Sequence, residues 1–404
     1  MKKPIILLLI CLLAMPLIYA EGENTEETRS PRTMTRGFEI GFDVGAVFSN
    51  NLLTVGEVFS DTVVIDIDRI SQGLMASLGL NAGFSINIDT RRGWGFGLSV
   101  GLEGTGAFNS GGILSLGNMD NEALDIGGAL YVVADINTFF HIKKFKITFN
   151  PSLFWAAAYF NPVIRYSLNT DDGVIFNYNA RDVRVYTAMP YDNLSGGAFE
   201  LTGTPGFDFT VGVEYPLAKE IGLSRLIPIL DFDVGVELQN IPIVPSVLRD
   251  YYGINDISDQ EINLLDMFGG SSPGFDDIDM NFTSGTGSAS FERAFKMLIY
   301  ANWRPLLGSK LLTVTPVLGL SNDFLYSRNV AFEGGVSATL NLADIFYATA
   351  GINFFDRTWI NSLDISINLR AFQLDLGIDM RSHDFIRSWT AGGVGARVGF
   401  RFGW

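Results

Sequence analysis

The sequence predicts an all-β protein: a transmembrane, antiparallel, up-and-down β-barrel of about 14 strands, with a range of roughly 12–16. Apolar and polar residues alternate with a period of two along most of the 404 residues. Although 47% of the residues are hydrophobic, the longest apolar run, residues 5–20, is too short to form a membrane-spanning helix. The connections between the alternating runs are mostly short at one end and mostly long at the other, as in bacterial barrels.

Residues 389–404 show the alternation most clearly. Beside glycines and one alanine, one face carries two arginines, Arg397 and Arg401. The opposite face consists of Thr390, Gly392, Val394, Ala396, Val398, Phe400, Phe402 and Trp404. A barrel strand directs apolar side chains to lipid and polar ones to the lumen; an edge strand of a large soluble sheet is the alternative. The terminal aromatic resembles the signal that outer-membrane barrels present to their assembly machinery, which is therefore an expected partner.

The other predicted strands repeat this pattern. In one of them, Leu78, Leu80 and Phe84 alternate with glycine, serine and asparagine. The strands that complete the barrel with the closing one are residues 38–48, 74–88, 94–108, 123–140, 145–160, 206–215, 229–239, 291–303, 311–321, 332–341, 345–354, 360–369 and 372–381.

The first 36 residues differ from the rest. Lys2 and Lys3 precede the apolar run that ends at Ala20, which predicts a cleaved secretory signal peptide over residues 1–20. The single cysteine, Cys11, lies within it. Residues 21–36 are polar and predict a short periplasmic tail, and residues 37–404 form the barrel. The expected location is the cell outer membrane.

The lengths of the connections predict how the barrel is oriented. With the C-terminus in the periplasm, most periplasmic connections are short, whereas residues 161–205 and 240–290 become long outer loops. The apolar face changes parity around Arg370 and Ala371, which predicts a tight turn there. Residues 174–186 are a candidate for an additional hairpin strand.

The strand number and the two long outer loops resemble the FadL family of long-chain fatty acid transporters. The resemblance implies that these loops capture a hydrophobic ligand. Ser258 and Glu261 form a capping-box pattern that predicts a short amphipathic helix. The residues expected to capture the ligand are Ile241, Ile243, Val244, Ile262, Leu265 and Phe268. The family's N-terminal hatch and its Asn-Pro-Ala motif are missing, so the chain looks closer to short-tailed, spirochaete-like members.

Charged residues on the lumen face predict an ion-pair ladder at the barrel seam. Antiparallel closure places Glu39 near Arg401 and Asp43 near Arg397, while Asp375 and Asp379 flank the arginines from the preceding strand. Such a ladder either stiffens the wall or forms a polar constriction or a site for a ligand headgroup. A second group of lumen carboxylates predicts a mildly cation-favouring interior; it consists of Asp208, Glu214, Asp231, Asp233 and Glu237.

Other functional classes have little support. The net charge of −16 argues against nucleic acid as a partner. The only two histidines, His141 and His383, lie in predicted turns, and residues 277–288 lack the glycine and glutamate of a calcium loop. We therefore expect no enzyme activity, cofactor or metal. The expected function is outer-membrane transport of hydrophobic or amphipathic small molecules such as long-chain fatty acids. The alternatives are a narrow cation-leaning porin and a surface barrel that binds a partner through its outer loops.

Overall fold

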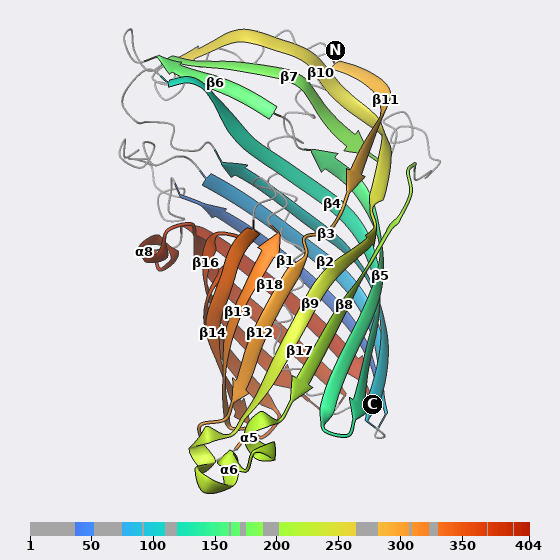
Figure 1. Ribbon diagram of the computed structural model, residues 1–404, viewed down its shortest axis with the longest axis vertical. Coiled ribbons are helices and arrows are strands. Elements are labelled where there is room, and N and C mark those ends of the chain that lie inside the picture. Colours follow the sequence, from blue (N-terminus) through green and yellow to red (C-terminus); the bar gives the residue numbers. More distant parts are fainter. Residues whose placement is uncertain are drawn as a thin grey trace.

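The computed structural model describes residues 37–51, 75–90, 93–109, 119–160, 163–169, 175–188, 202–263, 282–306, 309–322, 330–369, 371–390 and 392–404. These residues form a closed, antiparallel 14-stranded barrel, and four further strands extend the sheet above one side of it (Figure 1). The fold class and strand number predicted from the sequence are confirmed. The predicted signal peptide, including Cys11, and the predicted tail lie outside the described residues.

The barrel closes between its first and last strands. Each barrel strand pairs with its neighbours, and β18 returns to β1, with Gly41 opposite Arg401 and Gly45 opposite Arg397. The barrel strands are β1 (Phe38–Asn50), β2 (Met75–Thr90), β3 (Trp94–Asn109), β4 (Met119–Ile142), β5 (Phe145–Phe160), β8 (Gly206–Tyr215), β9 (Phe232–Val244), β12 (Lys296–Trp303), β13 (Leu312–Asn322), β14 (Val330–Leu342), β15 (Phe346–Phe355), β16 (Thr358–Asn368), β17 (Phe372–Ser382) and β18 (Gly393–Gly403).

Four further strands form an outer sheet that continues from β4. They are β6 (Val163–Asn169), β7 (Ile175–Thr187), β10 (Ser246–Asn263) and β11 (Phe282–Phe291). β6 pairs with β4 and β7, and β10 pairs with β7 and β11. Figure 1 shows these strands rising above the barrel, away from the short turns and the C-terminus. We call the end that carries the outer sheet the outer rim and the opposite end the inner rim.

The outer sheet corrects the predicted content of the long loops. The predicted helix at Ser258 and Glu261 is wrong, because both residues lie in β10, where Glu261 pairs with Asn177 of β7. A capping box satisfies only a few backbone groups at one helix end, whereas pairing with β7 satisfies groups along most of the strand. Residues 241–244, predicted as loop, form the upper end of β9. Ile262 lies in β10, and Leu265 and Phe268 lie outside the described residues.

The two faces of the barrel wall differ as the alternation predicts. On β18, Val394, Val398, Phe400 and Phe402 are exposed on the outside, whereas Arg401 is buried on the inside. Exposed apolar side chains that ring a barrel are stable only in contact with lipid. The predicted turn between β16 and β17 is also confirmed, since Leu369 and Phe372 exchange backbone hydrogen bonds of 2.7 and 3.2 Å.

Short helices occupy two of the connections. At the inner rim, β8 and β9 are joined by α5 (Leu217–Glu220), α6 (Leu223–Leu226) and the 3-10 helix η1 (Pro228–Leu230). At the outer rim, α8 (Phe385–Ser388) precedes β18, and the Asp384 carboxylate caps it by accepting a 3.0 Å hydrogen bond from the Arg387 amide. None of the helices within the described ranges is long and apolar enough to cross a membrane.

Candidate functional site in the barrel lumen

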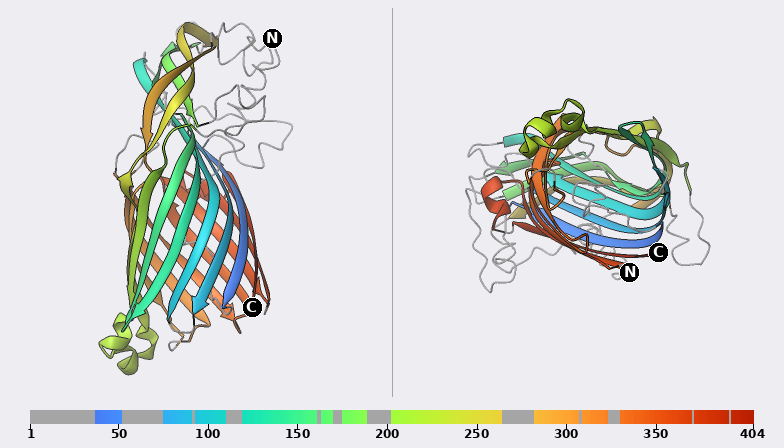
Figure 2. Two further views of the ribbon diagram at one scale, coloured as in Figure 1. Left: turned by 90° about the vertical axis from the view of Figure 1, so that its right-hand side faces the viewer. Right: turned by 90° about the horizontal axis from the view of Figure 1, so that it is seen from below.

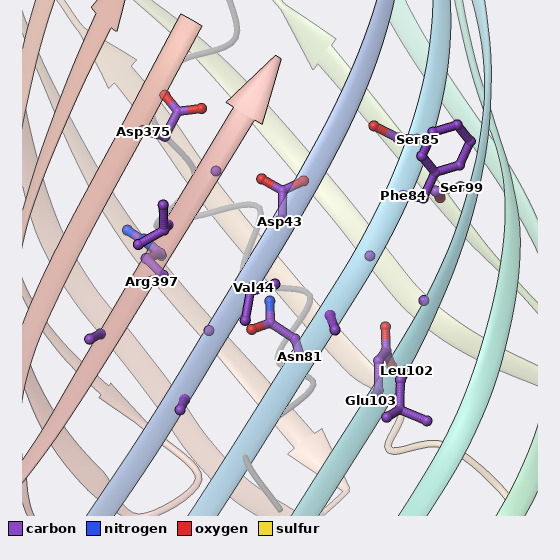
Figure 3. A pocket seen from close by; sticks show the side chains of 18 of the residues that line it. Asp43, Val44, Asn81, Phe84, Ser85, Ser99, Leu102, Glu103, Asp375 and Arg397 are labelled. Atoms are coloured by element: carbon purple, nitrogen blue, oxygen red, sulfur yellow. The ribbon is translucent and has the colours of Figure 1, made fainter. Parts of the chain in front are cut away.

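A polar cavity of about 140 Å³ lies inside the barrel between β1–β4 and β16–β18 (Figure 3). Its uncharged polar lining includes Asn81, Ser85, Ser99 and Asn137. Its charged lining consists of Asp43, Glu103, Asp135, Asp364, Asp375, Asp379, Arg381, Arg397 and Arg401. Carboxylates therefore outnumber guanidinium groups, six to three, in this lining.

Arg401 organises the part of the cavity nearest the inner rim. Its side chain is only 4% exposed and lies 3.8 Å from the Glu39 carboxylate and 3.4 Å from that of Asp43. It also donates a hydrogen bond to the Asp375 carboxylate on β17. The Gln373 side-chain amide donates a 2.8 Å hydrogen bond to Asp375. Arg401 thus ties the closing strand to both of its neighbours.

Arg397 occupies a more open position in the same wall. It pairs with Asp364, which lies on β16, beyond the intervening strand β17. The Arg397 side chain passes over Gly377 to reach Asp364. A Cβ at position 377 would overlap both side chains, so the absence of a side chain there leaves room for the contact. The Arg397 side chain is 35% exposed, far more than that of Arg401. It is therefore the more accessible of the two guanidinium groups to a molecule inside the lumen.

The predicted ladder thus has a different set of partners. The structure brings Glu39 beside Arg401, in the predicted arrangement. The prediction that Asp43 approaches Arg397 is wrong: Asp43 lies opposite Gly399, between the two arginines, and its carboxylate approaches Arg401. The Asp379 carboxylate accepts a 2.5 Å hydrogen bond from Arg381 on its own strand. Whether these residues also take part in a function stays a prediction.

Arg293 forms a second buried ion-pair centre, which the sequence pattern does not predict. Its guanidinium donates two hydrogen bonds, of 2.8 and 2.6 Å, to the Asp208 carboxylate. It also lies 3.7 Å from Glu103 and 3.9 Å from Asp135, and 5.4 Å above the centre of the Phe154 ring. Paired hydrogen bonds between guanidinium and carboxylate are among the strongest polar contacts in proteins. Arg293 therefore links the segment before β12 to β3, β4 and β8.

Alternation gave no signal for Arg293. If the alternation of β12 continued back from the exposed Ile299, Arg293 would lie on the lipid-facing side. The four residues between β11 and β12 belong to neither strand, so the alternation is interrupted there.

Beside Arg293, one side of the outer half of the lumen is apolar, whereas on another side Lys296 pairs with Glu333 and Asp356. A buried cluster joins inward residues of β4 and β5 to residues of the outer sheet; it consists of Ala129, Tyr131, Val133, Phe154, Ala156, Ala188, Leu248 and Phe291, with Tyr159 and Tyr186 packed against it. Ring centroids of Tyr131 and Tyr159 lie 5.2 and 5.6 Å from that of Phe291. We call this set the mouth cluster. Burial of each large side chain of the mouth cluster stabilises the folded protein by about 1.5–3 kcal/mol.

The predicted acidic group is divided among several places. Asp208 belongs to the Arg293 centre. Asp231 and Asp233 lie at the inner rim, where both bind Arg304 and raise its pKa, Asp233 more strongly. The Glu237 carboxylate accepts a 2.9 Å hydrogen bond from Gln239, and that of Glu214 accepts one of 3.4 Å from the Tyr300 hydroxyl. The expectation of a single cluster is therefore wrong, because the five residues are spread along the height of the wall.

Together, the closed barrel and its apolar outer surface define the chain as an outer-membrane-type β-barrel. The resemblance to the FadL family is confirmed at the level of the fold. The chain is similar to TodX, a toluene transporter of Pseudomonas putida, with 10% identity over 96% of this chain and 95% of that one and a TM-score of 0.50. The finer assignment to short-tailed, spirochaete-like members stays a prediction.

Two further solved structures are also similar. A FadL homologue of Pseudomonas aeruginosa has 8% identity over 91% of this chain and 90% of that chain, with a TM-score of 0.47. The CymD monoaromatic hydrocarbon channel has 9% identity over 92% and 89%, with a TM-score of 0.48. No family model matches the sequence, and a search of curated proteins gives no match.

Proposed function

We propose that this chain is an outer-membrane channel for hydrophobic or amphipathic small molecules, long-chain fatty acids among them. The observation that carries the proposal is the mouth cluster, which lines one side of the lumen near the outer rim with apolar and aromatic side chains. A water-filled pore has a polar interior. A dry apolar lining instead favours an apolar solute, by about 0.8 kcal/mol for each CH₂ group removed from water.

The position of the cluster supports entry from the outer rim. Leu248 and Phe291 belong to the outer sheet, whereas Phe154 and Val133 belong to the barrel wall. An apolar molecule that enters from the outer rim would pack between the outer sheet and the wall, in contact with Phe291 and Phe154. For an amphipathic ligand, the partly exposed Arg397 in the polar cavity would be a partner for an anionic headgroup.

TodX, a toluene transporter by its name, supports the same class of ligand, but the likeness itself concerns the fold. In this proposal the chain is exported by its signal peptide and inserted by the barrel assembly machinery. The inner rim then faces the periplasm and the outer sheet faces the exterior.

A second candidate, a narrow cation-leaning porin, is favoured by the charges of the cavity. Its six carboxylates outnumber its three arginines, and an excess of negative charge in a pore favours cations. The two candidates differ in the solute that they admit: the porin would pass hydrated ions, whereas the channel would bind apolar molecules.

Binding of a fluorescent fatty acid to the purified barrel tests the first proposal. We expect saturable binding that oleate displaces, and weaker binding in Phe291→Ala and Phe291→Asp. Phe400→Ala is the matched control, because Phe400 is exposed on the lipid-facing side. If the folded barrel does not bind the probe, or if both Phe291 variants bind it as well as the parent does, the proposal is wrong. A steady cation current in a planar bilayer would then support the porin.

A further inference from the structure

The connection between β8 and β9 presents an apolar surface at the inner rim that the lumen does not use. Ile221 is 61% exposed and Leu226 81% exposed, and Ile227 and Ile229 are also exposed. These four residues, which we call the apolar foot, lie within the segment that forms α5, α6 and η1. Several large apolar side chains exposed in one short segment indicate an interaction surface.

The foot is attached to the lipid-facing side of the wall. Trp303 lies at the end of β12, on the same face as the exposed Ile299. Its indole N–H donates a 2.7 Å hydrogen bond to the carbonyl of Ile229. At the start of the connection, Tyr215 stacks on Phe145, with ring centroids 4.7 Å apart. Aromatic residues at both ends of a barrel mark the membrane–water interface, so the connection begins and ends at that level.

The position of the helices agrees with this attachment. Seen along the barrel from the inner rim, α5 and α6 lie at the edge of the barrel outline (Figure 2, right). In the side view they lie below the wall, on the side of β8 and β9 (Figure 1). The apolar foot is therefore placed to meet the surrounding bilayer and does not cover the lumen.

Within the connection the two basic residues balance the two acidic ones, whereas the whole chain carries a net charge of −16. Glu220 is held by Lys144, and Asp231 by Arg304 at 2.7 Å. Lys219 and Arg225 lie in the last turns of α5 and α6. Basic residues beside exposed apolar ones are typical of segments that lie in a membrane interface and bind anionic lipid.

We propose that the connection between β8 and β9 is a membrane-binding element, in which the apolar foot inserts into the leaflet at the inner rim and Lys219 and Arg225 contact anionic phospholipid headgroups. The ligand is the lipid surface itself. The element would fix the depth of β8 and β9 in the bilayer, and β9 continues through Pro245 into the outer sheet. This inference does not depend on the solute that the lumen carries.

Site-specific fluorescence in vesicles tests the proposal. In a chain carrying Cys11→Ala, which has no other cysteine, Leu226→Cys and Ile221→Cys are each labelled with an environment-sensitive dye. The labelled chains are folded into phosphatidylcholine vesicles with and without phosphatidylglycerol. Lys143→Cys is the control, because Lys143 is exposed in the tight turn between β4 and β5. Its φ is 57° although it is not a glycine, so cysteine can take the same backbone conformation. Heat-modifiable mobility on gels establishes that each barrel has folded.

We expect the dyes at positions 226 and 221 to show blue-shifted emission and about twofold quenching by lipids brominated in their acyl chains, whereas the control stays water-like. Quenching should increase with phosphatidylglycerol, and Lys219→Glu with Arg225→Glu should remove that increase. Water-like emission at position 226 in both lipids would overturn the proposal. So would a blue shift that appears only at high protein density or after addition of a soluble periplasmic extract, since the surface would then bind a second copy or another protein.

Discussion

Arg401→Ala is the substitution expected to weaken closure of the barrel most. The Arg401 side chain is 4% exposed and lies beside the carboxylates of Glu39, Asp43 and Asp375. Its removal leaves the buried Glu39 and the partly buried Asp43 and Asp375 without their common cation, and breaking a buried ion pair in this way costs about 3–5 kcal/mol. The Arg397 side chain is 35% exposed, but that of its partner Asp364 is only 5% exposed, so Arg397→Ala, which leaves this one carboxylate without its cation, should cost about 1–3 kcal/mol. Val398→Ala removes lipid-facing atoms and should cost about 1 kcal/mol.

Urea unfolding of the barrel in lipid vesicles, followed by heat-modifiable mobility on gels, measures these differences in the free energy of unfolding. The expected order of loss is Arg401→Ala first, then Arg397→Ala, and Val398→Ala last. Adding Asp375→Asn to Arg401→Ala should recover part of the loss, because it removes one of the uncompensated carboxylates. If Arg401→Ala costs no more than Val398→Ala, Arg401 does not hold the closing strand in the way the contacts indicate.

Three further substitutions test other parts of the molecule. Arg293→Met should lower the free energy of unfolding by about 3–5 kcal/mol, more than Asp208→Asn, because it leaves several buried carboxylates without a cation; equal losses in urea unfolding would contradict this. Gly377→Ala should weaken the contact between Arg397 and Asp364, because its new Cβ would overlap both side chains. A urea midpoint of unfolding equal to that of the parent would show that the Arg397 side chain does not pass over Gly377. Burial lowers the pKa of His383 to about 4. The folded state therefore binds fewer protons than the unfolded state, and stability should fall by up to about 3 kcal/mol as the pH falls from about 6.5 to 4; His383→Gln should lose this part of the pH dependence, and an unchanged profile would refute it.

The barrel could be predicted from the sequence because its two environments impose a local pattern. Each wall strand separates lipid from the lumen, so the alternation of Leu78, Leu80 and Phe84 with small or polar residues reports both faces at once. The outer sheet has no such boundary along its length. Of its four strands, the sequence predicts only β7, from the candidate strand over residues 174–186, and places the others in loops. Local capping residues at positions 258 and 261 then suggested a helix where pairing with β7 decides the structure.

The candidate site was harder to predict, since strand pairing does not fix the reach of long side chains. Gly41 lies opposite Arg401, yet the Arg401 guanidinium extends along the strand to Asp43. Arg397 similarly passes over Gly377 to reach Asp364. Arg293 lies between two strands, where alternation gives no information. The mouth cluster also depends on contacts between the wall and the outer sheet, which a pattern confined to single strands cannot reveal.

Uptake of a radiolabelled long-chain fatty acid by whole cells shows whether this chain transports such a ligand. Bacterial cells that lack their own fatty acid transporter would express this chain, Phe291→Asp or the lipid-facing control Phe400→Ala at equal surface levels. We expect uptake well above that of cells without the chain, a strong loss with Phe291→Asp, and little change with Phe400→Ala. Uptake no greater than that of empty cells, from a barrel that is folded and present at the surface, would contradict it.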